Sequence, residues 1–112
     1  MIKFAQFHPA AITVIRDFPE QVRREVGKVV FDIQKGESLS MPLSRPMSSV
    51  KTGAHELRLK DSSGIYRVFY YTKVKEKILI FHAFTKKTQQ TPQHEIKMAQ
   101  KRLQEMLDYE KD

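Results

Sequence analysis

The sequence predicts an α+β domain in which helices pack on a small antiparallel sheet. Two segments, near residues 19–36 and 92–107, have hydrophobic residues at helical spacing. Between them, over residues 55–84, three strand-like runs follow one another with only short turns. Turns that short join antiparallel neighbours. The 112 residues are enough for one modest core, so we expect a single domain over 1–112.

The N-terminal third of the chain predicts one strand and two helices. Residues 2–7, IKFAQF, have the composition and length of a strand. Pro9 suits the first position of a short helix, and Pro19 ends that helix and opens the next. Gly36 fits the C-terminal cap of the second helix. We expect these helices to form a hairpin over the sheet, through the apolar stripe Val22, Val26, Val29, Val30 and Ile33.

The middle of the chain predicts a loop followed by three strands. Residues 36–54 are rich in Ser, Pro and Gly and predict an irregular loop. The run 55–60, HELRLK, alternates in polarity, and 65–73, IYRVFYYTK, forms the next strand. Residues 78–84, ILIFHAF, are apolar on both faces and predict a central strand.

The last element is a helix that carries Ile96, Ala99, Leu103, Met106 and Leu107 on its apolar side. Thr91 and Pro92 predict its N-cap and first turn. The expected order is therefore β-α-α-β-β-β-α.

Composition excludes several classes of protein. The chain has no cysteine, which rules out a disulfide framework and cysteine metal sites and favours a reducing compartment. The four histidines show no metal-ligand spacing, so we expect no metal and no cofactor. No run has the length of a membrane span, and the N-terminus lacks the pattern of a signal peptide. These features predict a soluble, cytoplasmic protein that does not bind membranes.

The net charge of +7 is concentrated in one segment. Residues 45–90 hold ten lysines and arginines and three acids, while the remainder is neutral. Such a field favours a polyanion, most often a nucleic acid, although a solvated basic surface would look the same. The cations of this segment are Arg45, Lys51, Arg58, Lys60, Arg67, Lys73, Lys75, Lys77, Lys86 and Lys87.

Strand alternation predicts that several of these cations share one face. If Leu57 and Leu59 face the helices, Arg58 faces away from them, and we place Arg67 on the same open side. Lys86 and Lys87 leave the end of the neighbouring strand. The predicted result is an exposed groove for a phosphate backbone, with aromatic rings nearby. The alternative interpretation for Arg58, Lys60, Lys86 and Lys87 is a merely solubilising surface, and His82 is expected to be a hydrogen-bonded structural residue.

Residues 54–107 resemble the C-terminal half of the RelE/HigB toxins, in particular the phage-derived HigB-like branch of the RelE/ParE superfamily. The resemblance rests on the strand ELR, the strand YRVFY, and the ending F.KK...TP..EI..A..R. It implies a RelE/ParE-like fold and a toxin of a type II toxin–antitoxin module. Many such toxins act as ribosome-dependent mRNA interferases without metal, and a HigA-like helix-turn-helix antitoxin is the implied partner, with ribosome and mRNA as targets.

The same resemblance implies roles for individual residues. Arg67 would clamp the phosphate, with Arg58, Lys87 and Lys86 as further cations. The type member has a catalytic tyrosine where this chain reads TQQTPQHEI, so Glu56, Tyr71, His94 and His55 are the candidates for proton transfer. The expected RNA contacts are Lys60, Arg45, Lys51, Lys73, Lys75 and Lys77.

Two other functions fit the same residues. ParE toxins share the fold but inhibit DNA gyrase, and an RNA-binding module without catalysis would need the same cations.

Overall fold

The computed structural model describes residues 2–86 and 91–110. The elements, in chain order, are β1 (Phe4–Phe7), α1 (Pro9–Arg16), α2 (Glu20–Gln34), β2 (Ser44–Pro46), β3 (Ala54–Asp61), β4 (Gly64–Tyr71), β5 (Lys77–Lys86) and α3 (Gln93–Glu110). The predicted α+β class is confirmed. The expected order lacked one strand, β2, because its three residues lie within the Ser- and Pro-rich stretch that predicted only a loop.

The strands form one sheet in the order β1-β5-β4-β3-β2. The run β3-β4-β5 is the predicted antiparallel meander, and β5 has a neighbour on each side, as its apolar sequence indicated. The sheet is not antiparallel throughout, because β1 pairs with β5 in parallel at one edge. A hairpin turn is too short to join two parallel strands. The chain between β1 and β5 accordingly runs through α1, α2 and the strands β2, β3 and β4.

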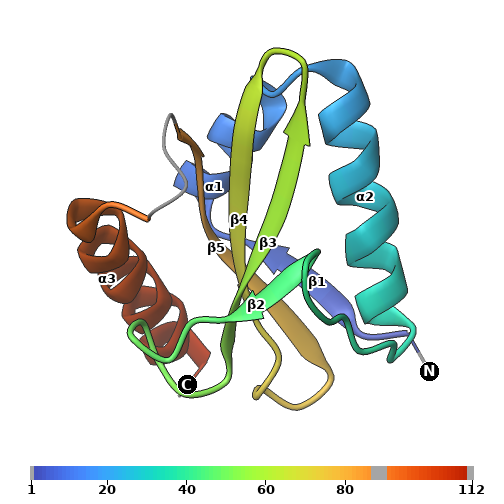
Figure 1. Ribbon diagram of the computed structural model, residues 1–112. Coiled ribbons are helices and arrows are strands. Elements are labelled where there is room, and N and C mark those ends of the chain that lie inside the picture. The colour runs from blue at the N-terminus through green and yellow to red at the C-terminus, as the bar shows by residue number, and fades with distance from the viewer. Residues whose placement is uncertain (1, 87–90, 111–112) are drawn as a thin grey trace.

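Helices cover both faces of the sheet (Figure 1). The hairpin of α1 and α2 packs on one face, where the whole predicted stripe of α2 is buried together with Leu57, Leu59, Val68 and Ile80. Each fully buried Val or Ile contributes about 1.5–3 kcal/mol relative to exposure. α2 ends as expected, because Gly36 has a φ of 96° and its N–H donates to Ile33 O.

α3 covers only part of the opposite face. Its Ala99, Leu103 and Met106 pack on Phe69, Phe81 and other residues of a second apolar cluster. This cluster occupies one end of β3 and β4. The other end of the same face, beyond the first turn of α3, carries Glu56, Arg58 and Arg67, and it is where the candidate site lies.

Candidate functional site: a cationic cluster around Glu56

Glu56 is the centre of the site. It lies on β3, and only 1% of its surface is exposed. Its Oε2 accepts a hydrogen bond of 2.7 Å from Thr91 Oγ1, just before α3. Its Oε1 lies 3.5 Å from Arg67 Nε and 4.0 Å from Arg58 Nε. A buried carboxylate is therefore held from three segments of the chain.

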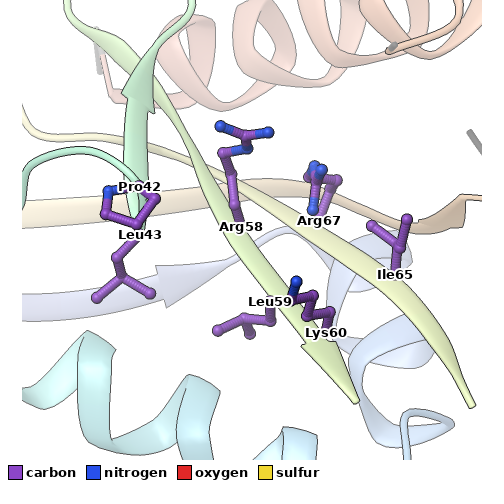
Figure 2. Close-up of a pocket in the computed structure, with 7 residues that line it drawn as sticks. All are labelled: Pro42, Leu43, Arg58, Leu59, Lys60, Ile65 and Arg67. Atoms are coloured by element: carbon purple, nitrogen blue, oxygen red, sulfur yellow. The ribbon is translucent and has the colours of Figure 1, made fainter. Parts of the chain in front are cut away.

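Arg58 and Arg67 lie opposite each other on β3 and β4 and share a face, as predicted. Figure 2 shows both side chains on the same side of the strand pair, with Leu59 pointing the other way. The prediction that Arg67 is exposed is wrong, because only 3% of its surface is accessible. Sequence alternation gives the face of a residue but not what covers that face. The Nη1 of Arg67 also donates to the Tyr66 carbonyl at 3.3 Å.

Two further cations complete the cluster. Lys86, at the end of β5, is 5% exposed and pairs in register with Ile65. Arg45 on β2 lies opposite Glu56 and is exposed. Burial lowers the pKa of Lys86, and the charge of Arg67 lowers it further, while Glu56 opposes both effects. Among the residues that the structure describes, four cations thus surround one carboxylate, which leaves this part of the cluster with a net positive charge.

Burial also lowers the pKa of Arg67, and the attraction of Glu56 raises it again. A guanidinium remains charged through such changes because its ordinary pKa is above 12. A buried ion of this kind costs several kcal/mol unless it is paired. Glu56 therefore makes the burial of Arg67 possible.

A pocket of approximately 320 Å³ opens beside the two arginines (Figure 2). Arg58, Lys60 and Arg67 supply its positive charge, and its apolar wall consists of Pro42, Leu43, Leu59 and Ile65. A hollow with cations at one side and aliphatic carbon at the other suits a phosphate that carries a sugar or a base.

The start of α3 borders the cluster. The helix begins at Gln93, and the carbonyl of Pro92 accepts from the N–H groups of Glu95 and Ile96. The predicted N-cap role of Thr91 is therefore wrong, since its hydroxyl binds Glu56 instead. The N-terminal end of the helix adds a favourable potential for an anion nearby.

A buried histidine fixes this end of α3. His82 on β5 is 3% exposed, its Nε2 lies 2.8 Å from Glu95 Oε1, and its Nδ1 lies 2.7 Å from Arg102 Nη1. Because an arginine can only donate, Nδ1 accepts and Nε2 carries the proton. Burial lowers the pKa of His82, which keeps the ring neutral. The expected structural role of His82 is confirmed.

The structure separates two of the other proton-transfer candidates, Tyr71 and His55, from the cluster. Tyr71 lies four residues beyond Arg67 along β4, about 13 Å away, and is buried in the apolar cluster beneath α3. His55 faces the opposite side of the sheet and stacks on Tyr70. His94 lies in the first turn of α3, where its Nε2 is 3.3 Å from Glu95 Oε2.

The predicted RNA contacts are scattered. Lys60 lines the pocket, and Lys51, Lys73 and Lys75 are exposed elsewhere. Lys77 forms an ion pair of 2.8 Å with Glu110 at the end of α3. Lys87 lies outside the described residues. In residues 2–86 and 91–110 no cluster of side chains has the composition of a metal site, and no helix could cross a membrane.

Sequence reasoning missed Thr91, Glu95 and Arg102 as neighbours of the site. Thr91 was predicted only as the N-cap of the last helix. The ending TP..EI..A..R contains all three, and the helical spacing of Glu95 and Arg102 places both on one face. That spacing was the available signal.

Comparisons with known proteins agree with this architecture. The profile of the family described as phage-derived protein Gp49-like (DUF891) matches residues 13–104. No curated protein matches the sequence.

Similar folds occur among solved structures. A RelBE2 toxin–antitoxin complex of Mycobacterium tuberculosis contains a chain with 15% identity and a TM-score of 0.55, and the match covers 77% of this chain and 100% of that one. A mutant of the E. coli toxin RelE in the free state has 17% identity and a TM-score of 0.58, over 74% and 82% of the two chains. The intact E. coli RelBE toxin–antitoxin complex contains a chain with 16% identity and a TM-score of 0.52, and the match covers 77% of this chain and 99% of that one. The RelE-like fold predicted from the sequence is therefore confirmed.

Proposed function

The chain belongs to the phage-derived Gp49-like protein family and has the RelE fold, and we propose on this basis that it is a toxin of a RelE-type toxin–antitoxin module that cleaves mRNA on the ribosome. The observation that carries the proposal is the cluster of Arg45, Arg58, Arg67 and Lys86 around a single carboxylate, beside an open pocket. Such an arrangement suits an anion whose charge increases during a reaction.

Cleavage of RNA needs that property. In the proposed reaction the 2′-oxygen attacks the adjacent phosphorus and the bond from phosphorus to the 5′-oxygen breaks. The products are a 2′,3′-cyclic phosphate and a 5′-hydroxyl. Arg58 and Arg67 lie close enough together to contact the same phosphodiester and stabilise the pentacoordinate phosphorane.

Two proton transfers accompany this step, because the 2′-hydroxyl loses a proton and the 5′-oxygen gains one. Within the cluster, Lys86 is a candidate for one of these transfers, since burial lowers the pKa of its ammonium group below the usual value. His94 remains a candidate for proton transfer from the sequence, and Lys87 remains a candidate cation.

The proposed partners follow from the same function. Complexes of RelE-type toxins with antitoxins are among the solved structures that share this fold, and we expect a HigA-like antitoxin here. The targets would be the ribosome and mRNA, so the protein would act in the cytoplasm.

One experiment tests the proposal. Purified protein is added to translating ribosomes with a defined transcript, and RNA ends are mapped by sequencing, with Arg58→Ala as the inactive control. Cuts in register with codons, absent from the control, support the proposal. Intact RNA contradicts it: DNA breaks that depend on gyrase would then indicate a ParE-like toxin, and salt-sensitive RNA binding alone would indicate a binding module.

A further inference from the structure

Glu56 has the wrong surroundings for a general base. A base must reach the 2′-hydroxyl directly or through one water. The Glu56 side chain is 1% exposed, and its Oε2 is engaged by Thr91 Oγ1. Its Oε1 faces Arg67 and Arg58 rather than the solvent.

The contact between Glu56 and Arg67 is incomplete. Oε1 and Nε are 3.5 Å apart, and both are buried atoms for which no hydrogen-bond partner is found within the described chain. Buried polar atoms in folded proteins normally have partners. The Arg67 guanidinium is thus attracted to Glu56 by charge without being saturated by it, and it retains capacity for another anion.

Arg67 also experiences repulsion from its own neighbours. Among the charges that act on it, Arg58 and Arg45 disfavour its ionised form, and Glu56 alone favours it. A phosphate in the pocket would be a second anion close to the first. The carboxylate and the phosphate would therefore compete for the same guanidinium.

We propose that Glu56 is a positioning residue, a fixed counter-ion that holds Arg67 in the site and weakens the binding of phosphate before reaction. Its cleavage role rests on the proposed function, while its effect on anion binding does not. A guanidinium that a fixed counter-ion already holds in place needs no reorganisation when charge develops on the phosphorane.

The binding arm uses the free protein and inorganic phosphate. Titrations by NMR at constant ionic strength compare wild type with Glu56→Gln, which has nearly the same shape and no charge. Because one nearby negative charge is removed, we expect phosphate to bind on the order of fivefold more tightly. Glu37→Gln is the matched control: it makes the same change in net charge at an exposed position after α2, where Glu37 pairs with Lys35, and should leave the affinity unchanged.

The kinetic arm uses translating ribosomes across a range of pH. For Glu56→Gln we expect cleavage to fall roughly tenfold through kcat without a rise in KM, and the pH profile to keep its shape. Loss of a general base would instead cost about 10²- to 10⁴-fold and remove one limb of the profile. Glu56→Asp should recover part of the rate, because it restores the charge.

The outcomes separate the two hypotheses. Unchanged or weaker phosphate binding by a folded Glu56→Gln variant overturns the inference, as does a lost limb of the pH profile. If wild type cleaves no RNA but Glu56→Gln binds phosphate more tightly, the proposed function fails and the counter-ion role stands. Circular dichroism and urea unfolding establish that each variant is folded. If Glu56→Gln is not, Glu56→Asp replaces it: its shorter side chain moves the charge away from Arg67, and phosphate affinity above that of wild type is then the expected result and unchanged affinity the one that overturns the inference.

Discussion

Arg58 and Arg67 face each other directly across the β3–β4 pair. Like charges in opposed positions of a sheet repel each other. The carboxylate of Glu56 reduces that repulsion, since it lies 3.5 Å from one Nε and 4.0 Å from the other. One acidic residue thus allows two guanidinium groups to occupy neighbouring strands beside the same pocket.

The two arginines should respond differently to truncation. Arg58→Ala is expected to reduce cleavage at least about 100-fold. It should change the free energy of unfolding by less than about 1 kcal/mol, because its contact with Glu56 is the longer one, at 4.0 Å, and Arg67 remains beside the carboxylate. Arg67→Ala should cost about 3–5 kcal/mol as well, since it takes from the buried Glu56 carboxylate its nearer guanidinium, at 3.5 Å. Ribosome assays and urea unfolding measure the two effects.

A double substitution separates stability from activity at this ion pair. Glu56→Leu combined with Arg67→Met should recover most of the stability lost in Arg67→Ala, because apolar pairs often replace buried ion pairs without loss. It should not recover cleavage. Activity in the double variant would contradict the role of Arg67 in the site.

The hydrogen bond from Thr91 to Glu56 should matter for activity. Thr91→Val removes the donor with little change in shape, and we expect a loss of about 1 kcal/mol in the free energy of unfolding together with slower cleavage. Thr85→Val, at an exposed position on the same face as the apolar cluster of α1 and α2, is the control. Equal cleavage rates for the two variants would show that the Thr91 contact is dispensable.

Stability should fall in mild acid because of His82. Burial lowers the pKa of His82, so the unfolded chain takes up its proton at a higher pH than the folded one. The contribution of the neutral ring is complete above the unfolded pKa of about 6.5, decreases below it, and is lost as pH falls through the folded pKa. Urea unfolding between pH 7.5 and 5 should show the decline.

Two variants check the assignment to this histidine. His82→Gln should reduce the dependence of the unfolding free energy on pH, because the titrating ring between Glu95 and Arg102 is gone. His94→Gln changes an exposed histidine at the start of the same helix and should leave the dependence as it is. An unchanged slope in His82→Gln would assign the effect to other groups.

Lys75 and Lys77 should differ although they are neighbours in sequence. Lys77→Ala breaks the ion pair with Glu110 and should lower the free energy of unfolding by about 1 kcal/mol. Lys75→Ala should leave stability unchanged and reduce the salt dependence of ribosome binding, as loss of an exposed phosphate contact would. Binding titrations at two salt concentrations distinguish these effects.

Much of the fold was predictable because its determinants are local. The stripe of α2, the cap at Gly36 and the alternation of β3 each depend on a few consecutive residues. β2 and the parallel pairing of β1 with β5 were not predictable in this way. A strand of three residues has almost no periodicity. The pairing of two strands that lie far apart in the chain produces no pattern in the sequence of either strand.

The sequence predicted which face of the sheet each side chain of the site occupies, but not how deeply it is buried. Alternation placed Arg58 and Arg67 together, as the register shows. It could not show that Thr91 would reach Glu56, or that Arg67 would be buried beside that carboxylate. Burial depends on how separate elements pack, and for that reason Thr91 was interpreted as a cap.

The parallel pairing of β1 with β5 bears on when the protein becomes active during its synthesis. Residues 4–7 find their partners only at residues 77–80, so the first strand of the chain waits for most of the polypeptide to be made. Contacts of such long range form late and slow down folding. We expect a nascent chain to remain harmless to the ribosome that is translating it until nearly all of it has emerged.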